Sequence, residues 1–312
     1  MANAPVAELA DAPDLGSGIF DVQVQALSGA PHQHNPNLLF SEGFGFFVVN
    51  LKIILLYLLQ NTIYCANIFV HTKNIVIERV CRMVIQGFQK LTLLDYPGKM
   101  ACTVFTAGCN LRCPFCHNSR LVINPSTESD YSTEEILAYL KKRQGILDGV
   151  AITGGEPLLH KDIDVFITKV RELGFSVKLD TNGTFPDRLK ELVSRGLVDY
   201  VAMDIKNSPE GYPETVGIGG YDISKIKESI AYLLENHVDY EFRTTVVREL
   251  HSVFSVDSIG KMIRGAKRHY IQAFIDSGEL IGFDLNPVPK EEMLEMQKIM
   301  SQYVDLCEIR GI

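Results

Sequence analysis

The chain has 312 residues and a formal net charge of −8, with 46% hydrophobic and 22% charged residues. These values are typical of folded globular proteins and exclude wholesale disorder, a collagen-like chain and a coiled coil. The acidic balance excludes a broad basic surface, so we expect no nucleic-acid partner. Seven cysteines are too few for a disulfide scaffold of this length, which indicates a reducing compartment and predicts a cytoplasmic protein.

Residues 1–82 show neither helical nor strand periodicity. Residues 1–37 are rich in Ala, Pro, Gly and Asn, and residues 44–59 form an apolar run that Asn50 and Lys52 interrupt. A secretory signal needs a basic start and a cleavage site, and a membrane span needs about 20 apolar residues without a central lysine. We therefore expect no membrane association from this segment.

The beginning of the chain also resembles a non-coding gene. Residues 6–18 can be back-translated into a sequence that looks like the 5′ half of a leucine transfer-RNA gene. We interpret residues 1–82 as a poorly ordered leader from a start codon assigned too far upstream. Translation is then predicted to begin near Met83, and residues 83–312 to form one catalytic domain. Peptides from residues 1–40 in the native protein would contradict this hypothesis.

From Met83 onward, β-branched runs alternate with amphipathic stretches of helical period, as in βα units around a parallel sheet. Six strands with right-handed crossovers, followed by a last short strand, predict a partial barrel or an open α/β sheet. Active groups in such folds gather at the carboxyl ends of the strands. The predicted strands are 101–106, 150–153, 176–180, 200–205, 241–247, 270–275 and 306–309. The predicted helices are 133–143, 161–173, 186–195, 223–236, 256–267 and 290–302.

A cysteine cluster comes directly after the first predicted strand, where Cys109, Cys113 and Cys116 have C-x3-C-x2-C spacing. Three thiolates from one loop can hold three irons of a four-iron cluster and leave one iron open to another ligand. A structural zinc loop is the alternative, with His117 as a fourth ligand next to Cys116. The remaining cysteines are isolated in the sequence, and the last two of them are predicted to be packing residues: Cys65, Cys81, Cys102 and Cys307.

Polar motifs follow the next three strands. They are TGGEP from Thr153, DTNG from Asp180 and MDIK from Met203. Paired glycines let backbone approach a ligand closely, although TGGEP alone is equally typical of a tight turn. Single charged residues at strand ends are usually solvated or paired. Together with the cysteines, however, these motifs predict polar clusters that converge at the carboxyl ends of the strands, at the opening of the barrel.

In this order the motifs resemble the radical S-adenosylmethionine (SAM) superfamily. Residues 86–99 (QGFQKLTLLDYPGK), 104–109 (VFTAGC) and 116–118 (CHN) are similar to the anaerobic ribonucleoside-triphosphate reductase activating proteins, which are relatives of the pyruvate formate-lyase activating enzyme. The resemblance runs from about Val84 to Gly311. It implies an α/β fold, a partial (β/α)6 TIM-like barrel.

The resemblance also implies cofactors and their residues. Cys109, Cys113 and Cys116 match the ligands of a [4Fe-4S] cluster whose open iron is chelated by the amino and carboxylate groups of SAM. In these activases the aspartates can help to site a monovalent cation, the lysine faces the methionine carboxylate, and the Gly-Gly-Glu motif holds the methionine amino group. The matching cofactor-binding residues are Gly154, Gly155, Glu156, Asp180, Asp204, Lys206 and, by position alone, Arg243.

The implied activity is an oxidoreductase reaction that activates a partner enzyme. Reductive cleavage of SAM gives a 5′-deoxyadenosyl radical, which abstracts hydrogen from a glycine of anaerobic ribonucleoside-triphosphate reductase to form a glycyl radical. Flavodoxin or ferredoxin would supply the electron, and no residue is needed as an acid or base. Asp95 to Gly98 is a candidate for lining the approach of the target, or a simple turn set by Pro97 and Gly98.

Three alternatives stay open. The chain could activate another glycyl-radical enzyme, or act on a small molecule as 7-carboxy-7-deazaguanine synthases do. The third, of a different class, is a non-catalytic zinc-binding module. Iron and sulfide analysis separates the zinc module from the two enzymes.

Overall fold

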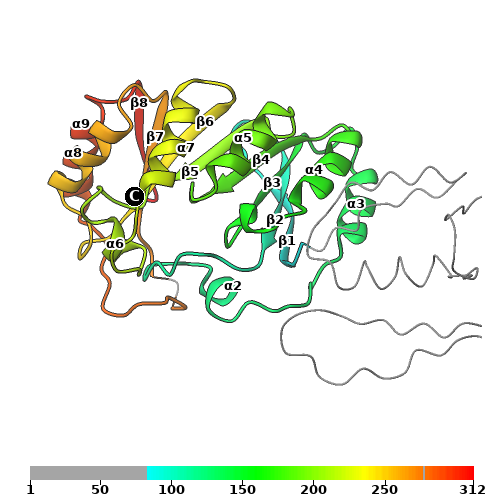
Figure 1. The fold of residues 1–312 in the computed structure, drawn as a ribbon, viewed down its shortest axis with the longest axis horizontal. Coiled ribbons are helices and arrows are strands. Elements are labelled where there is room, and N and C mark those ends of the chain that lie inside the picture. Colours follow the sequence, from blue (N-terminus) through cyan, green and yellow to red (C-terminus); the bar gives the residue numbers. More distant parts are fainter. Residues whose placement is uncertain (1–82, 277) are drawn as a thin grey trace, which may run out of the picture. The chain divides into compact units, whose positions relative to one another are not determined.

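A computed structural model describes residues 83–276 and 278–312. The predictions for residues 1–82 therefore lie outside the described residues. The described residues form one eight-stranded sheet in the order β1 to β8, in which β1 and β8 are the two edges. The pair β1 and β2 is antiparallel, and every later neighbour is parallel. The sheet curves, with helices along its outer side (Figure 1).

The predicted strands and helices are confirmed, with ends that shift by three residues or fewer in most elements. The strands are β1 (Ile85–Thr92), β2 (Ala101–Thr106), β3 (Gly149–Gly154), β4 (Ser176–Thr181), β5 (Tyr200–Asp204), β6 (Asp239–Val246), β7 (Arg268–Ala273) and β8 (Leu306–Arg310). The longer helices are α3 (Thr133–Lys141), α4 (Ile163–Glu172), α5 (Pro186–Ser194), α7 (Ser224–Leu234), α8 (Val253–Met262) and α9 (Lys290–Met300). Three short helical segments were not predicted: α2 (Ser119–Ile123), α6 (Tyr212–Thr215) and the 3-10 turn η1 (Pro157–Leu159).

Two elements show why sequence and structure differ. The edge strand β1 was not predicted, because its residues 86–91 are half-buried or exposed and carry no apolar run. Within it, Gly87 lies against the ring of Phe105, where a Cβ atom would approach to 3.1 Å. Helix α8 ends at Met262, about a turn earlier than predicted, and begins at a capping box between Ser252 and Ser255.

Two hydrophobic clusters lie on the two faces of the sheet. The larger one fills the space between the strands and the outer helices and includes Cys102 and Cys307. Both thiols are buried, and burial raises the pKa of each to about 12, which confirms them as packing residues. A smaller cluster of Tyr96, Ala101, Tyr200 and Ala202 lies on the inner face. Because successive side chains of a strand point to opposite faces of the sheet, every second residue of each strand lies on the inner face.

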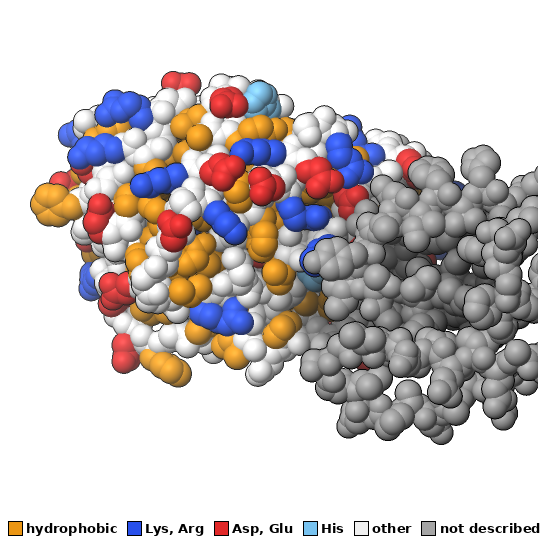
Figure 2. Space-filling model, in the orientation of Figure 1, with side chains coloured by type: hydrophobic (Ala, Val, Ile, Leu, Met, Phe, Trp, Pro, Cys, Tyr) orange, Lys and Arg blue, Asp and Glu red, His pale blue; other side chains and the backbone are white. Residues whose placement is uncertain are grey.

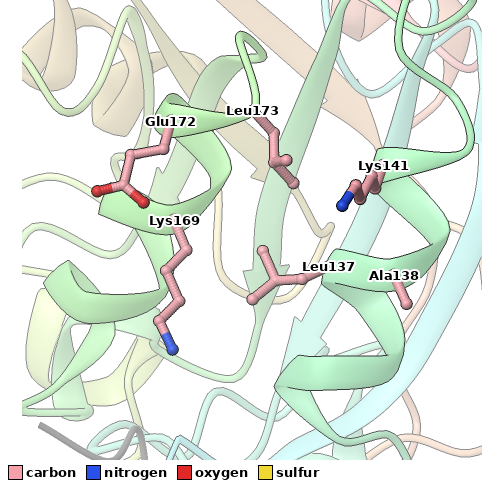
Figure 3. Close-up of a pocket in the computed structure, with 6 residues that line it drawn as sticks. All are labelled: Leu137, Ala138, Lys141, Lys169, Glu172 and Leu173. Carbon is pink, nitrogen blue, oxygen red and sulfur yellow. The ribbon is translucent and has the colours of Figure 1, made fainter. Parts of the chain in front are cut away.

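The outer surface is mixed in character. Figure 2 shows acidic and basic side chains interspersed with hydrophobic ones on one face of the described residues. A hollow of about 260 Å³ opens between α3 and α4 (Figure 3) and is lined by Leu137, Ala138, Lys141, Lys169, Glu172 and Leu173. It belongs to the helical layer and not to the strand ends. None of the helices in the described part of the chain is both long enough and apolar enough to cross a membrane.

Candidate active site

The four predicted motifs meet at one edge of the sheet. Strands β2 to β5 are parallel, so their carboxyl ends lie on the same side. The cysteine loop follows β2, Gly154 ends β3, Asp180 lies one residue before the end of β4, and Asp204 ends β5. Arg243 on β6 lies in register with Asp204. The structure therefore places the predicted site residues together.

Backbone hydrogen bonds fix the cysteine loop from three sides. The N–H of Gly108 donates to the carbonyl oxygen of Leu121 at 2.7 Å, and that of Arg112 donates to Val216 at 2.9 Å. The N–H of Gly282, from the segment after β7, donates to Pro114 at 2.8 Å. These bonds fix the position of the loop within the chain itself.

The three thiols have the chemistry of iron ligands. Burial raises the pKa of Cys113 to about 12 even though Lys206 opposes the shift, and burial also raises the pKa of Cys109 and Cys116. Metals bind the thiolate, so these buried thiols need the positive charge of a metal to ionise at neutral pH. The N–H of Leu111, at 3.4 Å, and the side-chain amide of Asn182, at 3.7 Å, donate to the sulfur of Cys109. Such donors suit a cluster-bound thiolate.

His117 makes contacts other than those of a fourth zinc ligand. Within residues 83–276 and 278–312, no three His, Cys, Asp or Glu side chains converge as the ligands of a single ion do. Thiolates that bind different irons of a cube need no such convergence. His117, the predicted fourth zinc ligand, stacks on Phe274 with ring centroids 5.9 Å apart. Its Nε2 atom lies 2.7 Å from the carbonyl oxygen of Ile275.

The glycine pair after β3 lies against the cysteine loop. The N–H of Gly155 donates to Thr106 at 2.9 Å, and that of Glu156 donates to Gly108 at 2.8 Å. Gly154 has φ +115°, and a Cβ atom at either glycine would collide with the backbone of Thr106 or Gly108. Only glycine permits this close approach. The motif is therefore more than a turn, because it joins β3 to the start of the cysteine loop.

Glu156 points inward. Its side chain is fully buried, and it accepts hydrogen bonds from the N–H of Leu158 at 3.0 Å, the hydroxyl of Thr181 at 2.9 Å and the N–H of Asn182 at 2.7 Å. Burial raises the pKa of Glu156 to about 7, although these three donors lower it. Three of about four acceptor positions are used. The structure shows Glu156 joining the ends of β3 and β4, and its contact with the methionine amino group stays a prediction.

A chain of alternating charges lines the inner edge next to the cysteine loop. Arg243 pairs with Asp180 at 3.1 Å and with Asp204 at 2.9 Å. Lys206 pairs with Asp204 at 2.9 Å, and Lys178 pairs with the other oxygen of Asp180. Lys178 was not predicted as a site residue. Its position two residues before Asp180 on the same strand was the available signal, because residues i and i+2 share a face.

Electrostatics keep the charged groups ionised. Burial alone would raise the pKa of Asp180 and Asp204, but Arg243 and the neighbouring lysines outweigh it and hold both pKa values below their ordinary range. Burial disfavours the charged forms of Lys206 and Arg243, yet Asp204 raises the pKa of Lys206, and Asp180 and Asp204 together raise the pKa of Arg243. All four groups therefore carry charge at neutral pH.

Two further residues that were not predicted as site residues hold the site, and one of them, Asn182, lies in the DTNG motif. The side-chain amide of Asn182 donates to the side-chain oxygen Oδ1 of Asn110 at 3.0 Å as well as to Cys109, and so joins the end of β4 to the cysteine loop. The buried ring of His251 lies 2.8 Å from the carbonyl oxygen of Lys206. Burial lowers the pKa of His251, which keeps the ring neutral as a hydrogen-bond donor to that carbonyl.

Comparison with known proteins identifies the family. A model of the radical SAM superfamily matches residues 103–252, which include the three cysteines and the charged edge. A protein of Methanocaldococcus jannaschii named as a glycyl-radical enzyme activating enzyme is 35% identical over 237 residues, 74% of this chain and 97% of that protein. The chain belongs to the radical SAM superfamily. Members use a [4Fe-4S] cluster and SAM, and the cysteine loop described above fits the cluster.

Two further proteins are similar to this chain. The pyruvate formate-lyase-activating enzyme of Clostridium pasteurianum is 32% identical over 146 residues, 44% of this chain and 60% of that enzyme. The crystal structure of Streptococcus suis SuiB bound to S-adenosylmethionine superposes with a TM-score of 0.52 at 14% identity, and the match covers 65% of this chain and 48% of SuiB. At that identity the likeness supports the fold, a partial TIM-like barrel of the radical SAM type.

Proposed function

We propose that this radical SAM enzyme activates a glycyl-radical enzyme, and that its target is anaerobic ribonucleoside-triphosphate reductase. The observation that carries the activase role is the 35% identity to a protein so named over 97% of that protein's length. The narrower target rests on the similarity of residues 86–99 and 116–118 to the activating proteins of that reductase.

The proposed residue roles follow the geometry of the site. Cys109, Cys113 and Cys116 would hold the cluster. With the cluster and SAM bound, one-electron reduction supplies a 5′-deoxyadenosyl radical that takes a hydrogen atom from the target glycine. The backbone at Gly154 and Gly155 would face the methionine part of SAM, next to the start of the cysteine loop.

The charged edge would hold the rest of the amino acid part of SAM. We assign Lys206 to the methionine carboxylate and Asp180, Asp204 and Arg243 to the same pocket wall. Their mutual ion pairs hold each side chain in place. Glu156 would support this wall by holding the end of β4 in place.

The protein must also exclude water and stray hydrogen donors from the radical. The segment after β7 contributes to this task. Its Gly282 bonds to Pro114, its Glu279 pairs with Arg120 at 2.6 Å, and Phe274 stacks on His117. These contacts hold the segment against the cysteine loop. The chemistry needs no general acid or base.

The turn before β2 has two parts with different roles. Tyr96 is buried in the inner cluster, so this residue packs and does not line an open approach. Asp95 is half-buried and accepts a hydrogen bond from Thr103 at 2.6 Å. Thr103 shares the inner face of β2 with Ala101. Asp95 is therefore the residue of this turn that we propose to contact an incoming peptide loop.

Electron paramagnetic resonance tests the proposed target. The reconstituted protein is mixed with SAM, a low-potential flavodoxin or ferredoxin, and the anaerobic reductase. We expect a glycyl-radical doublet on the reductase. Formation of 5′-deoxyadenosine without that doublet would exclude this target and leave another glycyl-radical enzyme, or a small molecule as in 7-carboxy-7-deazaguanine synthesis. The cytoplasmic location belongs to the same proposal, since the reductase and its reductants would have to be there.

A further inference from the structure

The two aspartates of the charged edge are already neutralised by the chain itself. Asp180 meets the ammonium of Lys178 at one oxygen and the guanidinium of Arg243 at the other, 3.1 Å away. Asp204 meets Arg243 and Lys206 in the same way, each at 2.9 Å. Each of the four carboxylate oxygens therefore has a cationic partner.

The charge balance does not fit a bound monovalent cation. Three cationic side chains face two carboxylates, so the group of Lys178, Asp180, Asp204, Lys206 and Arg243 has an excess of one positive charge. The methionine carboxylate assigned to Lys206 balances this charge, so an added cation finds no net negative charge and would have to displace a side chain to reach an aspartate oxygen. The monovalent cation that the resemblance implied for these aspartates therefore disagrees with the residues present.

Lys178 is the residue that creates this difference. Its side chain is 2% exposed and lies deep on the inner face of β4. Its neighbours in register are Ala151 on β3, a small residue, and Tyr200 on β5. A buried ammonium group is tolerated only when it is paired. The positive charge of Lys178 is therefore paired with the carboxylate of Asp180.

We propose that Lys178 is a built-in counter-ion, whose ammonium takes the place of a monovalent cation at Asp180 and makes the binding of SAM independent of K⁺ and Na⁺. Lys178 is a positioning residue, because it acts on the cofactor through Asp180. The proposal rests on the location of the SAM pocket given above. It does not depend on which protein or molecule receives the radical.

Binding of SAM to the anaerobically reconstituted holoenzyme tests the proposal. The dissociation constant is measured at equal ionic strength in potassium chloride, sodium chloride and tetramethylammonium chloride, whose cation is too large for the site. We expect the wild type to bind with the same affinity in all three salts. Lys178→Met is expected to lose about tenfold or more in tetramethylammonium and to recover in K⁺ or Na⁺, which can then occupy the vacated position at Asp180.

Two controls accompany this comparison. Lys178→Arg keeps a cation in place and is expected to bind SAM independently of the salt. Lys261→Met removes an exposed lysine that pairs with Asp257 in the outer helical layer, and it should behave as the wild type. Iron content is measured for every variant, so that lost cluster is not taken for lost affinity.

Either of two results would overturn the proposal. The first is a wild type that loses SAM affinity when K⁺ and Na⁺ are removed, which needs no variant and holds even if Lys178→Met fails to fold. The second is a folded Lys178→Met that binds equally in all three salts. Both results are SAM affinities measured without a partner protein. They can therefore be told apart from a failure of the proposed function, which is the absence of a glycyl radical on the reductase.

Discussion

Replacing Glu156 with alanine is expected to destabilise the folded protein by about 2–6 kcal/mol. Two buried backbone N–H groups, those of Leu158 and Asn182, would lose their acceptor, and each unsatisfied group costs about 1–3 kcal/mol. The hydroxyl of Thr181 can rotate to another acceptor and adds less. Glu156→Gln should lose less free energy of unfolding than Glu156→Ala, because one oxygen still accepts hydrogen bonds. Some loss is expected, because the amide nitrogen that replaces the other oxygen faces a donor.

Equilibrium unfolding of the wild type and each variant, in the same cluster state, measures this change. Glu172→Ala is the matched control, since this carboxylate at the end of α4 is exposed and its loss should change the free energy of unfolding by less than about 0.5 kcal/mol. SAM affinity is measured in parallel. If Glu156→Ala keeps the wild-type free energy of unfolding but binds SAM poorly, the supporting role is wrong and the direct contact is right.

Three further changes have defined outcomes. Cys113→Ala should abolish cluster assembly, because two thiolates cannot hold the cube; near-normal iron and sulfide content after reconstitution would contradict this. His269 is buried with a pKa lowered to about 3, so the unfolded chain takes up its proton first as pH falls. The contribution of neutral His269 to the free energy of unfolding is then fully present above about pH 6.5 and decreases by up to about 1.4 kcal/mol for each pH unit below it. The free energy of unfolding of His269→Gln should therefore fall less steeply as the pH is lowered. Arg310→Met removes two bonds, at 3.0 and 3.1 Å, from the buried carboxylate of Glu241, which keeps the bond from the Tyr200 hydroxyl at 2.9 Å, and it should cost about 1.5–3 kcal/mol. Adding Glu241→Gln should restore part of that loss in denaturant unfolding, and an additive double variant would contradict the pairing.

Strands β2 to β8 could be predicted because buried parallel strands carry β-branched runs between amphipathic helices. The same pattern located the cysteine loop and the three polar motifs at the carboxyl ends. Strand β1 could not be found in this way, since it pairs along one edge and is partly exposed. Its position becomes evident only from its pairing with β2.

The residues proposed for the site were taken from the sequence, whereas the contacts among them were not predicted. The sequence places Glu156 beside the glycines, and only the fold shows that its carboxylate turns toward Thr181 and Asn182. Lys178 was readable from strand alternation, yet its pairing with Asp180 depends on how deep β4 lies in the sheet. Contacts between distant strands follow from register, which composition and motif spacing do not determine.

Hydrogen transfer from the target to the cofactor tests the central claim most directly. The anaerobic reductase is prepared with glycine that carries deuterium at both α positions, and 5′-deoxyadenosine is isolated after one turnover with this protein, SAM and reductant. Direct abstraction predicts 5′-deoxyadenosine that contains one deuterium, together with a glycyl radical on the reductase. Unlabelled 5′-deoxyadenosine and a reductase without radical would contradict the account.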